Sequence, residues 1–141
     1  MESSAHALPS ILLAEDDPEM RTLLAESLRS DGYRVEEAES GAALARAIAA
    51  RLERRHLASL DLIVSDVRLP GLSGLEVIDA LRSVDWSVPV IVMTAFGDED
   101  VRAEALRLGA VAVLDKPFDV ESLRSVVRRA LATRGASSLP P

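Results

Sequence analysis

Short apolar runs alternate along this chain with longer segments in which apolar residues recur at helical spacing. The short runs predict strands over residues 10–14, 34–38, 62–65, 90–94 and 111–114. The longer segments predict helices over residues 19–30, 42–57, 74–84, 99–108 and 120–132. Strands that are separated by helices pair in parallel, so the alternation predicts an α/β fold with one open sheet that helices cover on both faces.

The length of the chain limits this fold to one domain. Its 141 residues are 48% apolar and 28% charged, which is typical of a globular protein with its own core. Residues 1–8 are mostly small or polar, and residues 133–141 are rich in small residues and end in two prolines. We therefore expect a flexible lead-in over 1–8, a single domain over 9–132 and a disordered tail over 133–141.

The composition argues against several classes of function. The net charge of −7 disfavours sequence-independent binding to nucleic acid, which needs lysine and arginine to neutralise phosphates. No apolar stretch approaches the roughly 20 residues that cross a bilayer, and the first residues lack the basic and apolar regions of a signal peptide. Since the chain has no cysteine, the composition fits a cytoplasmic protein that does not insert into membranes.

Four of the predicted strands end in, or are soon followed by, polar residues. In chain order these are Glu15-Asp16-Asp17, Asp66, Thr94 and Lys116. Parallel strands have their carboxyl ends at the same edge of the sheet, and open α/β sheets bind ligands at that edge. The pattern therefore predicts one site that combines acids, a hydroxyl and an amine, as metal-dependent phosphoryl transfer requires.

The acids have two interpretations each. Three adjacent carboxylates at residues 15–17 repel one another, and Mg²⁺ suits a site with one or two carboxylates and waters. Alternatively, one of them caps the helix that begins near Pro18. Asp66 is either a helix cap or turn residue before Pro70-Gly71, or a nucleophile, since a carboxylate can attack a phosphoryl group and form an acyl phosphate.

Thr94 and Lys116 also have a structural alternative. Threonine is common at strand ends because of its β-propensity, and a single lysine is usually a solvated surface charge. In an acidic site, the Thr94 hydroxyl could instead bond a phosphoryl oxygen, and Lys116 could serve as counter-charge and phosphate ligand. Pro117 restricts Lys116 to an extended backbone and would aim its side chain inward if the peptide bond is cis.

Together these motifs resemble the receiver domain of two-component response regulators. The resemblance covers residues 9–132 and includes the acids at 15–17, the stretch 65–74, Thr94-Ala95 and Lys116-Pro117-Phe118, with Gly74, Ala95 and Pro117 also matching the pattern. It implies a doubly wound, five-stranded sheet in the order 2-1-3-4-5 with five helices. It also implies a phosphorylation switch, rather than an enzyme acting on other molecules.

The resemblance further assigns roles to residues. Asp66 would accept a phosphoryl group from a histidine kinase or a histidine phosphotransfer protein. Mg²⁺ would be bound by Asp16, Asp17, Asp66 and the main-chain carbonyl of Arg68. Thr94 and Lys116 would contact the phosphoryl oxygens, and the activated form would bind a protein target that the sequence does not identify.

The chain departs from the receiver pattern three positions before Lys116. Receivers usually carry tyrosine or phenylalanine there, and this chain carries Val113. We therefore expect activation to rest on movement of Thr94 and of the loop 95–100. Arg68 and Phe96, two positions beyond Asp66 and Thr94, are expected to flank the phosphoryl group and to influence its lifetime.

The second predicted helix, 42–57, is also about two turns longer than in most receivers. Its end carries Arg51, Arg54 and Arg55, which form a basic patch on an acidic chain. The patch is either a solvated helix end, with cations near the negative end of the helix dipole, or a docking surface for a partner.

The favoured hypothesis is a stand-alone phosphoacceptor that controls, or relays phosphate to, a partner protein. One alternative is an adaptor with the receiver fold that works without phosphorylation, which Val113 favours. Another is a receiver excised from a larger regulator. A third is a phosphohydrolase of the haloacid-dehalogenase type, which needs a second aspartate two residues after the nucleophile, where this chain has Arg68.

Overall fold

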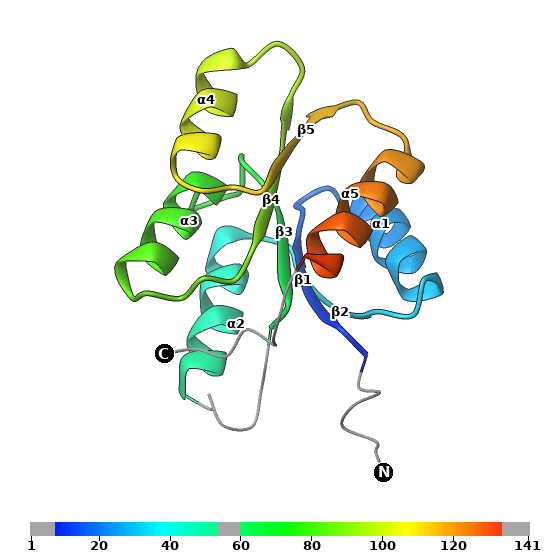
Figure 1. Ribbon diagram of the computed structural model, residues 1–141, viewed down its shortest axis with the longest axis horizontal. Coiled ribbons are helices and arrows are strands. Elements are labelled where there is room, and N and C mark those ends of the chain that lie inside the picture. Colours follow the sequence, from blue (N-terminus) through cyan, green and yellow to red (C-terminus); the bar gives the residue numbers. More distant parts are fainter. Residues whose placement is uncertain (1–7, 54–59, 134–141) are drawn as a thin grey trace.

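The computed structural model describes residues 8–53 and 60–133 of the chain. At its centre lies a parallel five-stranded sheet in the order β2-β1-β3-β4-β5 (Figure 1). The strands are β1 (Ser10–Ala14), β2 (Arg34–Ala38), β3 (Leu62–Asp66), β4 (Val90–Ala95) and β5 (Ala112–Lys116). The predicted α/β class and the strand order 2-1-3-4-5 are therefore confirmed.

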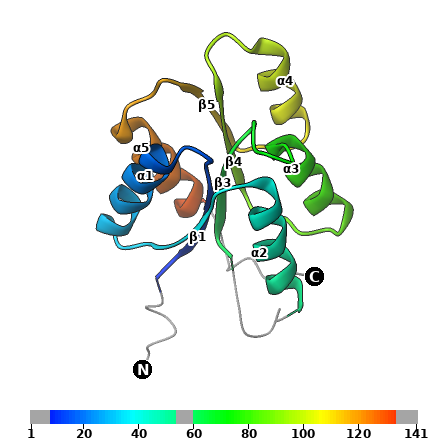
Figure 2. The same cartoon turned by 180° about the vertical axis from the view of Figure 1, so that it is seen from behind.

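One helix follows each strand. The helices are α1 (Pro18–Ser30), α2 (Gly41–Glu53), α3 (Gly74–Ser83), α4 (Glu99–Arg107) and α5 (Val120–Ala132). Helices α1 and α5 cover one face of the sheet, and α2, α3 and α4 cover the other (Figures 1 and 2). The sheet is thus the middle of three layers, as the alternation of strands and helices predicts.

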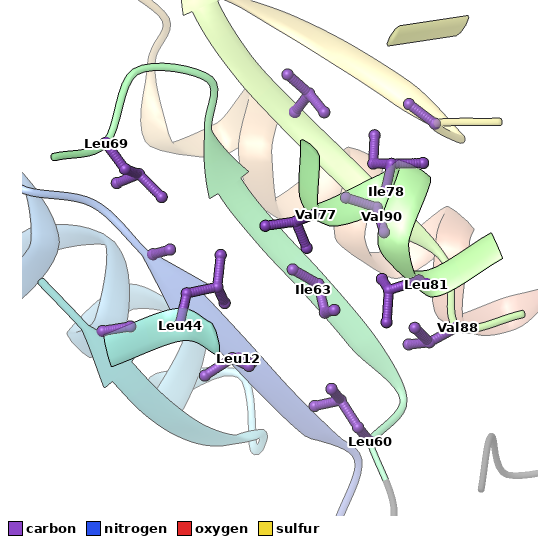
Figure 3. Packing of buried hydrophobic residues seen from close by; sticks show 14 of the residues in the cluster. Leu12, Leu44, Leu60, Ile63, Leu69, Val77, Ile78, Leu81, Val88 and Val90 are labelled. Carbon is purple, nitrogen blue, oxygen red and sulfur yellow. The ribbon is translucent and has the colours of Figure 1, made fainter. Parts of the chain in front are cut away.

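The core has two parts because side chains alternate between the two faces of each strand. Leu12 and Ile63 point toward α2 and α3, and their neighbours Leu13 and Leu62 point toward α1 and α5. Figure 3 shows the first cluster, in which side chains from the sheet, α2 and α3 interdigitate. Both faces of the central strands are apolar because both are buried.

Three strands extend one or two residues beyond the predicted ends, and these additions contain residues of the predicted site. Backbone pairing continues through Asp66, which lies opposite Met93, and through Lys116, which lies opposite Ala95. A polar side chain does not end a strand when a neighbouring strand still pairs with its main chain. Asp66 and Lys116 are consequently held by the sheet itself and not by a loop.

The second helix is described as far as Glu53. The remainder of the predicted segment, with Arg54 and Arg55, lies outside the described residues, as do most of the predicted lead-in and tail. Arg51 is 2.8 Å from a carboxylate oxygen of Glu36 on β2, so this member of the predicted basic patch forms an ion pair with the sheet.

Trp86, the one tryptophan of the chain, is 1% exposed. The structure buries the ring completely, in the cluster that also contains Leu81 and Val88, where α3 leads into β4. Arg82 donates hydrogen bonds to the main-chain carbonyls of Trp86 and Val88. These bonds hold the connection between α3 and β4 closed over the core, so the side chain of Trp86 stays buried.

Among the described residues, no helix has the length and apolar character needed to span a membrane.

We expect Leu81→Ala to lower the free energy of unfolding by about 2–5 kcal/mol, because it leaves a cavity beneath α3. Leu81 is 2% exposed. Urea denaturation followed by circular dichroism measures the change. Leu106→Ala on α4 is the control, since Leu106 is 49% exposed and its loss should shift stability by no more than about 0.5 kcal/mol. Equal losses in the two variants would contradict the packing described above.

Candidate functional site

The predicted site residues meet at the carboxyl edge of the sheet. In the described part of the chain, the buried polar or charged residues are Glu15, Ser65, Asp66 and Thr94, and all four lie at this edge. Lys116, at the end of β5, reaches the same place although β4 lies between its strand and β3, which carries Asp66. Burial of acids is unfavourable unless they are paired, so this concentration marks a functional site.

Lys116 contacts both buried acids. Its Nζ donates to Oδ2 of Asp66 at 2.6 Å and to Oε1 of Glu15 at 2.8 Å. Asp66 also accepts a hydrogen bond at Oδ1 from the main-chain N–H of Arg68, at 3.0 Å. Both oxygens of Asp66 are therefore held in place, which fixes the orientation of its carboxylate.

The pKa values follow from this arrangement. Burial acts to lower the pKa of Lys116, but the hydrogen bonds to Asp66 and Glu15 outweigh it, and the pKa lies above its ordinary value. Burial raises the pKa of Glu15 by more than Lys116 lowers it. Two buried carboxylates, those of Glu15 and Asp66, thus share one ammonium, so the site contains more acidic than basic groups.

Glu15, Asp16 and Asp66 form a potential metal site. Each can offer a carboxylate oxygen, and these three oxygens lie within 4.8 Å of one another. Oxygen ligands at this density, with Asp16 exposed to solvent, suit a hard divalent cation such as Mg²⁺ that retains several waters. The residues present therefore fit the metal that the receiver resemblance implies.

The structure does not bring Asp17 into this cluster. Asp17 is the N-cap of α1, where its Oδ1 accepts from the N–H of Glu19 at 3.2 Å. Its own N–H donates to Oε2 of Glu15 at 3.0 Å. The geometry therefore groups Glu15 with Asp16 and Asp66, and metal binding by the predicted pair Asp16 and Asp17 stays a prediction. The signal was present in the sequence, since proline favours the first position of a helix and Pro18 makes the preceding residue the cap.

The residues expected to modulate the site lie around it. Arg68 is 78% exposed, and its guanidinium lies 3.6 Å from the carboxylate of Asp98. Phe96 is 80% exposed, and its N–H donates to the main-chain carbonyl of Lys116. The Lys116–Pro117 peptide bond is cis. The predicted role of the Arg68 carbonyl as a metal ligand stays a prediction.

Thr94 and Val113 lie on the two strands beyond Asp66. Thr94 is buried and lies opposite Asp115 on β5. Val113 lies opposite Val92, is half-buried and packs against the core cluster on the side of α3 and α4. The position that is aromatic in most receivers is therefore occupied by a small apolar side chain.

Gly74 explains how closely α3 approaches the site. A Cβ atom at this position would lie 2.8 Å from the main-chain oxygen of Asp66 and 3.3 Å from Oγ of Ser65. Its N–H donates to the carbonyl of Val67 at 2.9 Å. Glycine is needed here because the first turn of α3 touches the end of β3.

Comparison with known proteins agrees with this geometry. Residues 11–128 match the model of the response regulator receiver domain. The chain belongs to this family. Receiver domains are phosphoacceptor regulators in two-component signal transduction, which is a different class from the haloacid-dehalogenase type of hydrolase.

Individual relatives show how much of each protein is shared. The chain is 32% identical over 121 residues to sporulation initiation phosphotransferase F of Bacillus subtilis (strain 168), covering 86% of this chain and 92% of that protein. It is 34% identical over 130 residues to the transcriptional regulatory protein ZraR of Klebsiella oxytoca, covering 92% of this chain and 28% of that protein. The chain thus spans only about a quarter of the length of that regulator.

Solved structures give the same result. The chemotaxis response regulator CheY4 of Vibrio cholerae superposes with a TM-score of 0.74 and 30% sequence identity, covering 89% of this chain and 100% of that one. A response regulator receiver domain protein from Clostridium thermocellum gives a TM-score of 0.78 at 26% identity, covering 89% and 95%.

We expect Mg²⁺ to raise the thermal unfolding midpoint of the protein, because an ion that binds only the folded state stabilises it. Asp16→Asn should remove most of this increase. Asp17→Asn is the matched control, since asparagine is an equally good N-cap and the structure places Asp17 outside the cluster. Differential scanning calorimetry, with NaCl at matched ionic strength as reference, measures both. The opposite result, with Asp17→Asn abolishing the increase, would restore the pair expected from sequence.

Proposed function

We propose that Asp66 accepts a phosphoryl group from a histidine kinase or a histidine phosphotransfer protein, and that the modified protein changes its binding to a partner protein. The observation that carries the proposal is the carboxylate of Asp66, buried at the end of β3 and held by Lys116 and by the N–H of Arg68. In the proposal this carboxylate is the nucleophile, and Glu15 and Asp16 are the two further acids beside it.

The transfer would be a simple displacement at phosphorus. One carboxylate oxygen of Asp66 forms the new P–O bond while the P–N bond of a phosphohistidine breaks and the imidazole leaves. Lys116 then pairs with a phosphoryl oxygen, and the hydroxyl of Thr94 donates to another. Such catalysis consists mainly of positioning and charge stabilisation, which the buried Thr94 on β4 and the half-buried Lys116 on β5 can provide.

Glu15, Asp16 and Asp66 would hold Mg²⁺, with the main-chain carbonyl of Arg68 as the further ligand implied by the receiver resemblance. When bound, Mg²⁺ neutralises negative charge on the transferring group. The excess of acid over ammonium described above supports this assignment, since the site as it stands contains more carboxylate than Lys116 can pair.

The lifetime of the acyl phosphate would depend on access of water. Attack of water at phosphorus breaks the bond to Asp66 and releases inorganic phosphate and the free carboxylate. Arg68 and Phe96 are largely exposed beside this edge, where their side chains could shield the phosphoryl group from water or leave it accessible. We assign them the control of this slow autodephosphorylation.

A receiver-fold adaptor that works without phosphorylation is the second candidate. The half-buried Val113 favours it, because the aromatic switch of most receivers has no counterpart here. The intact contacts among Glu15, Asp66 and Lys116 favour the phosphoacceptor. The same chemistry would serve a stand-alone receiver or one joined to further domains.

The proposal places the protein in the cytoplasm, in accord with the absence of cysteine. Its output would be contact with protein and not with nucleic acid, because the net charge is −7.

Incubation with a small phosphodonor and Mg²⁺ should add one phosphoryl group to the wild-type protein and none to Asp66→Asn. Intact-mass spectrometry measures the addition. Asp79→Asn on α3 is the matched control, since it makes the same chemical change at an exposed position and should remain competent. A mass increase in Asp66→Asn would refute the assignment of the acceptor, and no increase in any sample would favour the adaptor.

Lys116→Ala should slow phosphoryl transfer by at least about tenfold, because it removes the cation that pairs with both Asp66 and the transferring group. Mg²⁺ binding should persist, since the three carboxylates remain. Initial rates of phosphorylation and a calorimetric Mg²⁺ titration separate the two effects. A loss of Mg²⁺ affinity as large as the loss of rate would contradict the role assigned to Lys116.

A further inference from the structure

Arg21, the fourth residue of α1, reaches back to the acidic loop of residues 15–17 that joins β1 to α1. Its main-chain N–H donates to the carbonyl of Asp17 at 2.8 Å. Side chains of a helix tilt toward its N-terminus, so the guanidinium lies beside the residues that precede α1. Its Nη1 donates to the main-chain carbonyl of Glu15 at 2.9 Å. The side chain is 19% exposed, which shields this contact from water.

A carboxylate on the neighbouring strand holds the guanidinium in this position. Nε of Arg21 lies 3.3 Å from Oε1 of Glu37 on β2. Arg29, about two turns further along α1, donates from Nη1 to Oε2 of the same carboxylate at 3.0 Å. Arg29 also donates from Nη2 to the main-chain carbonyl of Val35 at 2.7 Å. Both oxygens of Glu37 are therefore engaged, and Arg21 is fixed against β2.

The bond from Arg21 completes the polar contacts of Glu15. The N–H of Glu15 donates to the carbonyl of Ala38 at 3.0 Å. Its Oε1 accepts from Lys116, and its Oε2 accepts from the N–H of Asp17. The carbonyl that Arg21 bonds belongs to the peptide unit that leads into Asp16. The orientation of this unit sets the direction in which the exposed side chain of Asp16 leaves the main chain.

We propose that Arg21 positions the carboxylates of Glu15 and Asp16 for Mg²⁺ by holding the peptide unit between them. The inference rests on the proposed function, in which these two acids and Asp66 bind the ion. Residues that orient the ligands of a metal without touching it typically contribute about 10- to 100-fold to metal affinity. The planar guanidinium suits this role, because its fixed fork of donors can bond a carbonyl and a carboxylate at once.

The sign of the effect separates positioning from simple charge. A guanidinium near the site repels a divalent cation, so its removal would strengthen Mg²⁺ binding if charge were its only contribution. If Arg21 positions the ligands, its removal weakens binding. The two roles therefore predict opposite changes in the Mg²⁺ dissociation constant.

The first test is a calorimetric titration with Mg²⁺ alone. Arg21→Ala should raise the dissociation constant about tenfold. Arg21→Lys keeps the charge and one donor but lacks the fork, so it should recover part of the loss. Arg29→Ala is the matched control, because Arg29 shares the partner Glu37 but bonds none of residues 15–17, and it should leave the dissociation constant unchanged. Circular dichroism checks that each variant is folded, and Arg21→Lys carries the test if Arg21→Ala is not.

The second test is amide hydrogen exchange without Mg²⁺. Arg21→Ala should accelerate exchange at residues 15–17 about threefold, because one hydrogen bond no longer restrains the loop. Arg29→Ala should not change it.

The outcomes distinguish this inference from the proposed function. Unchanged or tighter Mg²⁺ binding in Arg21→Ala, or equal losses in Arg21→Ala and Arg29→Ala, would overturn the positioning role while the proposed metal site stands. Unchanged exchange at residues 15–17 in Arg21→Ala would overturn it as well. No Mg²⁺ binding by the wild type would refute the metal site of the proposed function and the role of Arg21 with it.

Discussion

Lys116 carries a single charge and contacts two buried carboxylates, Glu15 and Asp66, which arrive from different strands. The ammonium is a compact point charge with several donors, so it can bond both acids at once without the planar geometry that a guanidinium requires. The arrangement lowers the cost of burying the acids but leaves the site negative. In the proposed function, that remaining charge would favour binding of a divalent cation at this edge of the sheet and, with the cation, of a phosphoryl group.

The parallel register of the sheet places these groups together. The carboxyl ends of β1, β3, β4 and β5 lie at one edge, and the apolar residues of β1, β3 and β4 are buried on both faces of the strand. Gly74 permits α3 to touch the end of β3, and the capping box of Ser73 and Glu76 begins the helix at that point. The close packing of α3 against β3 thus fixes the main chain from which Asp66 extends.

Much of this follows from the sequence, because it depends on patterns that local chemistry produces. The alternation of apolar runs and helical segments predicts the order and number of the elements, and Asp66, Thr94 and Lys116 could be selected by their places after buried strands. The acids at residues 15–17 are harder to tell apart, because only Pro18, which favours Asp17 as the cap of α1, distinguishes them in the sequence. Glu15 and Asp17 are chemically alike, and their roles differ because one turns inward to Lys116 while the other begins α1. The contacts of Arg21 with Glu15 and Glu37 depend on the tertiary packing of α1 against β2, which a periodic pattern does not contain.

Trp86 lies at the opposite edge of the sheet from Asp66, before the first residue of β4 and not after its last. Its indole is enclosed by the core between α3 and the sheet, and no other tryptophan contributes to emission. Its fluorescence therefore reports whether the core around α3 and the start of β4 is folded. Changes confined to the acidic edge, such as cation binding, should leave that emission nearly constant, and they need a reporter placed elsewhere.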